Sequence, residues 1–146
     1  MLSKKTKYGI KALTYICKNE ERSPISIGEI SKAENIPHKF LEAILVILKK
    51  GKVVSAKKGK NGGYYLLRDA REIFMSEVIR LLNGPIAMLP CVSLNFYEKC
   101  EDCPFEEGCG VNQLMLEVRD SALQVLEHKS LYQLTSEIKI AEDTLS

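Results

Sequence analysis

Four of the five cysteines in this chain fall within one short stretch, and their spacing is the strongest chemical signal in the sequence. Cys91, Cys100, Cys103 and Cys109 leave eight, two and five residues between them. Thiolates are soft ligands that select zinc, copper(I) or iron–sulfur clusters. Four of them suffice for a tetrahedral zinc site, and three or four suffice for a cluster. We therefore predict a metal site here, with four reduced, unligated cysteines as the alternative.

Thiol chemistry without a metal is a second interpretation of the same residues. A thiolate pair such as Cys100 and Cys103 can oxidise reversibly. The Cys-Glu-Asp-Cys sequence also resembles the motif of thiol oxidoreductases, but those enzymes place it at a helix start after a strand. Here the surroundings are predicted loop, and two acidic residues separate the thiols. We therefore predict that the protein is not an enzyme, and we interpret the isolated Cys17 as a buried apolar residue.

A second group of residues indicates DNA binding. A short helix over 26–34, a tight turn and a longer helix over 37–50 form the helix-turn-helix pattern. The leading residues of the second helix reach base edges in the major groove, and here these are His38, Lys39 and Glu42. Lys39 suits a guanine or a phosphate, and Glu42 suits a cytosine amino group. A solvated surface charge is an equally good interpretation of Glu42.

A β-hairpin is predicted directly after this pattern. Residues 53–55 begin one strand and residues 63–67 form another, with a turn rich in glycine and lysine between them. A hairpin in this position is a wing, and we expect Lys57, Lys58 and Lys60 to lie near phosphates or the minor groove. A solvated loop is the alternative interpretation.

The charge of the chain is divided between its two halves. Residues 1–68 carry 15 Lys/Arg and 5 Asp/Glu, a net charge of +10, whereas residues 69–146 carry 6 and 14, a net charge of −8. The basic half suits a polyanion such as the DNA backbone, which repels the acidic half. We therefore expect a DNA-binding end and a control end.

Capping residues set the expected helix boundaries. Ser26 followed by Glu29 matches a capping box, in which each side chain accepts a backbone N–H of the first turn. Pro37 is expected to open the longer helix, and Gly51 to end it. Ser76 is expected to cap a brief helix over 76–82.

Further helices are expected over 4–18, over 111–129 and, in the tail, after Ser130. The helix over 111–129 has apolar residues at alternating steps of four and three, a heptad-like pattern that favours dimerisation, although a helix buried within a monomer is the alternative. The pattern is formed by Val111, Met115, Val118, Ala122 and Val125. The loop over 86–110 is longer than usual, so we expect it to be functional or held by a ligand.

The expected fold is mainly α-helical with a small β-hairpin: a winged helix-turn-helix plus a long dimerisation helix. We expect a DNA-binding domain over 1–70, a short helix and cysteine-rich sensor loop over 71–110, and a dimerisation helix with a tail over 111–146. No apolar run of membrane-spanning length is present, and because the first eleven residues are polar and basic we expect no secretory leader. A cytoplasmic protein without a membrane partner is therefore expected.

Three stretches of the chain, 7–13, 36–45 and 51–64, resemble the Rrf2 family of bacterial winged-helix regulators. This family includes an iron–sulfur biogenesis regulator, a nitric-oxide-sensing repressor and a cysteine-metabolism repressor. The resemblance implies a homodimeric repressor on a partly palindromic double-stranded DNA operator. It also implies that an iron–sulfur cluster, with two or four irons, controls DNA binding by ordering the loop. Zinc or thiol sensing remains the alternative.

The resemblance also bears on which cysteines are ligands. Relatives that bind a cluster have three loop cysteines, with five to eight residues in the first gap and usually five in the second. The five residues between Cys103 and Cys109 fit the second gap. For the first gap, the eight residues between Cys91 and Cys100 fit, whereas the eleven between Cys91 and Cys103 are too many. Some relatives use an additional ligand, which is either a histidine three residues after the last cysteine or an acidic residue near the N-terminus. In this chain the first position is Asn112, and the second falls near Lys7. Neither suits a metal, so the extra cysteine is expected as the fourth ligand.

Overall fold

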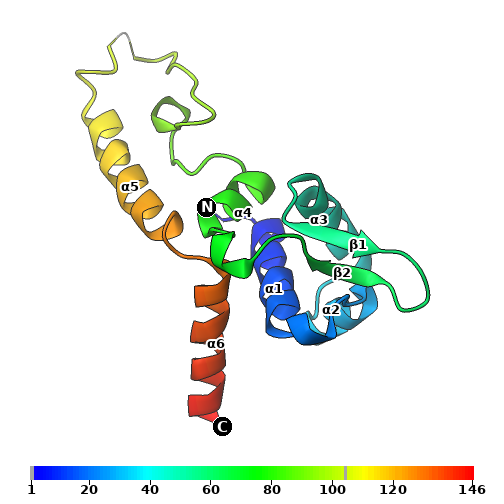
Figure 1. The fold of residues 1–146 in the computed structure, drawn as a ribbon. Helices are drawn as coiled ribbons and strands as arrows, with labels where there is room; N and C mark the ends of the chain where they lie inside the picture. The colour runs from blue at the N-terminus through cyan, green and yellow to red at the C-terminus, as the bar shows by residue number, and fades with distance from the viewer. Residues whose placement is uncertain (1, 104) are drawn as a thin grey trace.

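The computed structural model describes residues 2–103 and 105–146. The described helices are α1 Lys4–Lys18, α2 Ile27–Glu34, α3 His38–Lys50, α4 Met75–Leu82, α5 Gly110–Leu126 and α6 Leu131–Leu145. The strands are β1 Val54–Lys57 and β2 Gly63–Leu66, and the 3-10 turns are η1 Glu20–Arg22, η2 Ala70–Glu72 and η3 Pro90–Val92. Figure 1 shows helices α1 to α4 and the β1–β2 hairpin gathered into one body, called the head below, with α5 and α6 beside it and a long loop leading into α5.

The core lies where α1 packs against α2, α3, α4 and α6. Apolar residues three and four positions apart bring one face of each helix inward, which is the helical period. The deepest side chains have no more than 2% of their surface exposed, and they include Leu13, Ile16, Ile30, Ile36, Leu41, Ile44, Leu45, Leu48, Ile73 and Leu131.

The helix-turn-helix is formed as predicted, with small differences at its boundaries. The Ser26 side chain accepts the Glu29 N–H at 3.2 Å and caps α2. The return half of the expected capping box is absent among the described contacts, because the Glu29 carboxylate bonds to Arg22 and Tyr15 instead. Asn35, at φ 53°, makes the tight turn. Pro37 is the N-cap, so α3 begins one residue later than expected.

The predicted cap of α4 is wrong. Ser76 lies within the helix and is buried, and Phe74 occupies the N-cap position. The helix starts earlier because Phe74 makes a β-bridge with Ser130, a long-range contact that local sequence does not contain.

The wing is an antiparallel hairpin in which Val54 pairs with Leu66 and Lys57 pairs with Gly63. Its base is joined to the segment before α2, because the Tyr64 N–H donates to the Ile25 carbonyl at 2.8 Å. A Cβ at Gly63 would lie 2.3 Å from the same carbonyl oxygen, so only glycine fits there.

The expected tail helix forms and packs against α1. A full capping box starts α6: the Ser130 hydroxyl accepts the Gln133 N–H at 3.1 Å, and the Gln133 side chain accepts the Ser130 N–H at 3.0 Å. The Leu131 N–H donates to the Ile73 carbonyl at 2.7 Å. The C-terminal end of α5 is thereby held against the head.

Candidate DNA-binding surface and cysteine cavity

The leading residues of α3 are exposed to solvent, as recognition of DNA requires. The side chains of His38 and Glu42 are 55% and 52% exposed, and their Nδ1 and Oε1 atoms are 4.0 Å apart. Lys39 is also exposed. All three predicted residues therefore lie on the side of α3 away from the core.

Buried contacts on the opposite side fix the position of α3. Leu41, Ile44 and Leu45 are fully buried in the head. The Phe40 ring meets the Tyr8 ring of α1 edge to face, with centroids 5.7 Å apart and planes at 88°. This geometry is favourable for aromatic pairs, and it ties the first turn of α3 to α1.

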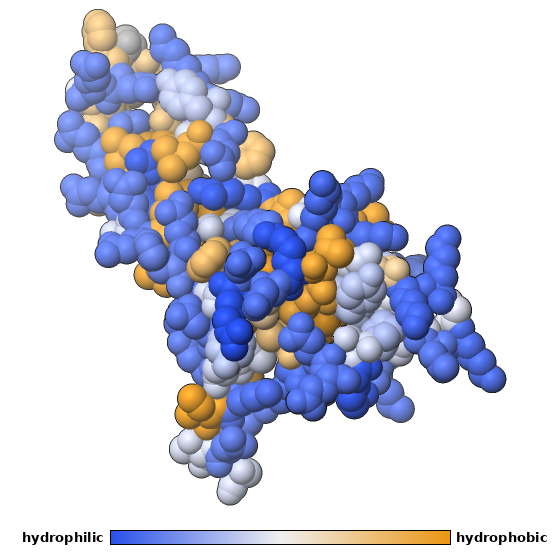
Figure 2. Space-filling view, in the orientation of Figure 1, coloured by the Kyte–Doolittle hydropathy of each residue, from blue (hydrophilic) through white to orange (hydrophobic). Residues whose placement is uncertain are grey.

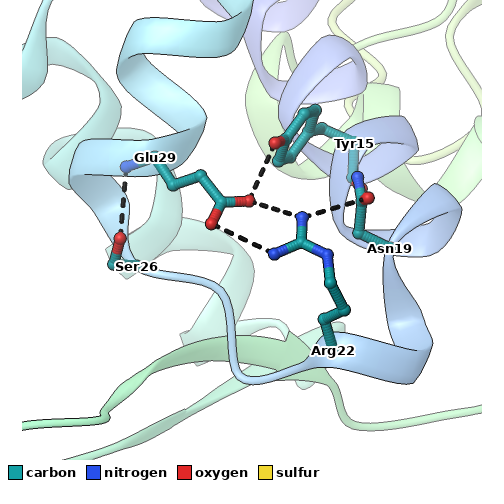
Figure 3. A network of polar contacts seen from close by, with 5 residues as sticks. All are labelled: Tyr15, Asn19, Arg22, Ser26 and Glu29. Atoms are coloured by element: carbon teal, nitrogen blue, oxygen red, sulfur yellow. Dashed lines mark hydrogen bonds and ion pairs between the residues drawn. The ribbon is translucent and has the colours of Figure 1, made fainter.

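A polar network braces α2 against α1 (Figure 3). The Glu29 carboxylate accepts from Tyr15 Oη at 2.8 Å and from Arg22 Nη2 at 2.8 Å, and Arg22 also donates to Asn19 at 3.1 Å. Hydrogen bonds from Arg22 and then Tyr15 lower the pKa of Glu29, and the bond to Glu29 raises the pKa of Tyr15. Sequence reasoning did not predict this network, because its members come from three elements.

The wing lysines are exposed and project from the head. Lys57 closes β1, and Lys58 and Lys60 lie in the turn that follows. The loop between β1 and β2 extends outward in Figure 1, and the same projection is hydrophilic in Figure 2. The cations are therefore placed where a polyanion can approach them.

All four loop cysteines line one cavity of about 200 Å³. Two of them, Cys100 and Cys103, come from the loop; Cys91 comes from η3, and Cys109 precedes α5. The rest of the lining consists of Leu89, Glu106, Val111 and Asn112. The structure thus gathers the predicted sulfur ligands around one space.

The N-terminus of α5 acts directly on the sulfur of Cys109. Cys109 is the N-cap, and its Sγ accepts the Asn112 N–H at 3.5 Å. This N–H, and a hydrogen bond from Cys103, lower the pKa of Cys109. The same contact with Cys109 is the main reason that the pKa of Cys103 is raised to about 11. The two sulfurs thus have pKa values shifted in opposite directions, lowered at Cys109 and raised at Cys103.

The cavity differs from a closed single-metal site. Within residues 2–103 and 105–146, no three His, Cys, Asp or Glu side chains converge closely enough to hold one metal ion. A zinc site needs four sulfurs about 2.3 Å from one point, whereas a cluster spreads its thiolates over several irons. The four thiols line a shared cavity of about 200 Å³, and among the described residues no three of them converge on one metal position.

An exposed recognition helix, a basic wing and a braced helix-turn-helix define a winged helix-turn-helix transcription regulator. The chain belongs to the Rrf2 family, whose model, described as an iron-dependent transcriptional regulator, matches residues 2–137. It is therefore a DNA-binding regulator and not an enzyme. None of the described helices is long and apolar enough to cross a membrane.

Individual relatives agree with this assignment. The chain is 39% identical to an Rrf2-like HTH-type regulator of Rhodobacter capsulatus, over 90% of this chain and 89% of the relative. It is 26% identical to the regulator IscR of Xenorhabdus nematophila, over 97% and 82%. The solved structure of CymR, the global cysteine regulator of B. subtilis, matches with a TM-score of 0.77 and 26% identity, over 94% and 97%.

Proposed function

We propose that this chain is a homodimeric repressor that binds a partly palindromic operator, and that an iron–sulfur cluster held by Cys91, Cys100, Cys103 and Cys109 controls its affinity for DNA. The observation that carries the proposal is that all four thiols line one cavity at the start of α5. When bound, a cluster would cross-link loop thiolates to this helix.

The path from the cavity to the DNA-binding surface follows α5 and the bridge at its end. Cys109 caps the first turn of α5. At the other end, the Met75 N–H donates to the Lys129 carbonyl at 3.0 Å and Leu131 bonds to Ile73. Because both ends of α5 are tied, ordering of the loop biases the placement of α5 relative to the head. In a dimer, that placement sets the distance between the two recognition helices.

The surface of α5 supports a second copy of the chain as its partner. Apolar residues along this helix remain exposed in one chain: Val111 at 57%, Leu114 at 54%, Val118 at 39% and Val125 at 60%. Orange side chains are visible at the surface near α5 and the loop in Figure 2. Of the four exposed residues, Val111, Val118 and Val125 belong to the predicted heptad-like pattern, and a matching helix from a partner would bury them.

DNA recognition is assigned to the exposed residues of α3 and the wing. Lys39 meets a guanine or a phosphate, and Glu42 accepts from a cytosine amino group, with His38 beside them. The wing lysines Lys57, Lys58 and Lys60 neutralise phosphates. The exposure of all six residues supports this assignment.

The decisive experiment is to purify the protein without oxygen and to measure iron, acid-labile sulfide and the visible spectrum. Operator binding is then compared between this form and protein from which iron has been removed by chelation. The proposal expects iron and sulfide in equal amounts and an operator affinity that changes on their removal. Protein that contains neither, or that binds the operator equally well in both forms, contradicts it.

A thiol switch is the second candidate, and the pairing of Cys103 with Cys109 favours it. The lowered pKa of Cys109 makes its thiolate form easier to reach than that of an ordinary cysteine, and the raised pKa of Cys103 keeps this neighbour protonated. Forming a disulfide from this thiolate and thiol would release one proton, from Cys103, and pass two electrons to an external oxidant such as diamide. Loss of operator binding on diamide treatment of metal-free protein, reversed by dithiothreitol, supports this candidate. Zinc without sulfide in the anaerobic protein would instead indicate a zinc site.

A further inference from the structure

Asn112 occupies an unusual place beside the cysteines. Its side chain lies in the first turn of α5, and the residue is only 8% exposed. The amide Nδ2 donates to Cys91 Sγ at 3.4 Å, and the backbone N–H of the same residue donates to Cys109 Sγ at 3.5 Å. One residue therefore contacts the sulfurs of both the first and the last cysteine of the loop.

The chemistry of the contact depends on the charge of the sulfur. A neutral thiol is a weak hydrogen-bond acceptor, whereas hydrogen bonds to negatively charged acceptors are shorter and stronger. A buried amide N–H requires a hydrogen-bond acceptor, and the side-chain amide of Asn112 donates to Cys91 Sγ. The contact is therefore most favourable when this sulfur carries negative charge, as a metal-bound thiolate does.

A second contact keeps Cys91 in reach of this donor. Arg119 Nη1 donates to the Val92 carbonyl at 2.8 Å, and the Arg119 side chain is only 15% exposed. Arg119 lies seven residues after Asn112, which is about two helical turns, so both side chains lie on the same side of α5. The η3 turn that carries Cys91 is thus held to α5 at two points.

We infer that Asn112 is the hydrogen-bond donor that orients and electronically tunes the sulfurs of Cys91 and Cys109 in the metal-bound site, and that it is not a ligand. This inference rests on the proposed cluster. A donor to a ligating sulfur stabilises the negative charge added on reduction, so it raises the reduction potential of the centre. Asn112 thereby sets the potential at which the regulator responds.

The test compares anaerobically prepared wild-type protein with Asn112→Ala, Asn112→Asp and the control Gln113→Ala, which removes the neighbouring exposed amide. Iron and sulfide per chain are measured first, and the reduction potential is then measured by spectroscopic titration. We expect Asn112→Ala to keep the wild-type iron and sulfide content and to become harder to reduce. The expected change is on the order of tenfold in the one-electron equilibrium, or about 59 mV. Asn112→Asp should shift in the same direction, and Gln113→Ala should match the wild type.

Equal reduction potentials in the wild type and Asn112→Ala overturn the inference about Asn112 and leave the proposed cluster standing. Loss of iron from Asn112→Ala with retention in Asn112→Asp also overturns it, because that result would identify residue 112 as a ligand. Loss of iron from both variants overturns it as well, because a side chain that only donates to a ligating sulfur is not needed to hold the iron. Wild-type protein without iron and sulfide instead overturns the proposed cluster itself, so the two failures are distinguishable.

Discussion

Arg22 Nη2 lies 2.8 Å from Glu29 Oε2 across the turn that joins α1 to α2. The same carboxylate accepts the Tyr15 hydroxyl, so one acid joins α1, η1 and α2. The orientation of the first helix of the DNA-binding motif therefore depends on a contact that is itself partly exposed to solvent.

Replacing Glu29 with Ala should lower the free energy of unfolding at neutral pH by about 1 kcal/mol, a value reduced for solvent exposure. Because the folded-state pKa of Glu29 is lowered, its contribution is present above the ordinary carboxyl pKa and is lost as the pH falls through the folded-state pKa. The difference between wild type and variant in urea denaturation should therefore shrink in acid. Glu21→Ala, which removes an exposed acid of η1, is the control, and a difference that grows in acid would contradict the assignment.

The lysines of α3 and the wing should contribute to DNA affinity through charge. Lys39→Ala or Lys58→Ala should weaken operator binding and, where a phosphate contact is lost, lower the slope of log affinity against log salt by about one. Lys139→Ala removes an exposed lysine of α6 and serves as the control. Fluorescence anisotropy over a salt series measures both quantities. Unchanged affinity in both variants would mean that the docking surface is misassigned.

Glu42 should act on sequence preference more than on total affinity. A carboxylate that accepts from a cytosine amino group discriminates against the wrong base by about 1–3 kcal/mol. Glu42→Ala should therefore relax selectivity at one base pair in each half-site, as measured by binding to a set of single-base operator variants. A uniform change across all variants would instead identify Glu42 as a surface charge.

Burying a charge on the apolar face of α5 should separate the chains of the proposed dimer. Val125 is 60% exposed in one chain, and a carboxylate there would lose its hydration on association. Val125→Glu should therefore be monomeric at micromolar concentration in sedimentation experiments and should bind the operator more weakly. Gln124→Glu adds the same charge at the neighbouring position and is the control. A dimeric Val125→Glu protein would show that the partner lies elsewhere.

Cysteine replacements should divide the five thiols into two groups. Cys91→Ser and Cys109→Ser should lose bound iron after anaerobic purification, because each removes a sulfur of the cavity. Cys100→Ser and Cys103→Ser should also lose iron, because both sulfurs line the cavity and belong to the four proposed ligands. Cys17 is half-buried beside the core rather than fully buried as the sequence predicts, and desolvation raises the pKa of its thiol. It lies outside the cavity and should tolerate replacement without loss of iron. Retention of iron by the Cys91 and Cys109 variants would contradict the ligand assignment.

Much of the architecture could be predicted from the sequence because the relevant signals are local. Apolar periods of three and four residues placed α1, α3 and α5, and glycine- and lysine-rich residues marked the hairpin turn. The Rrf2 resemblance was carried by contiguous stretches and is confirmed. Exposure of His38 and Lys39 followed from the same helical period.

Contacts between residues that are distant in the chain follow from the packing of whole elements. Ser76 has the chemistry of an N-cap, yet the bridge between Phe74 and Ser130 starts α4 earlier. The sequence predicts only that Asn112 is a poor ligand, whereas in the fold its amide donates to Cys91 Sγ, 21 residues away in the chain. Helix periods and caps depend on neighbours within a few residues, so the sequence contains them; hydrogen bonds between separate elements depend on packing of the whole chain, and no local pattern records them.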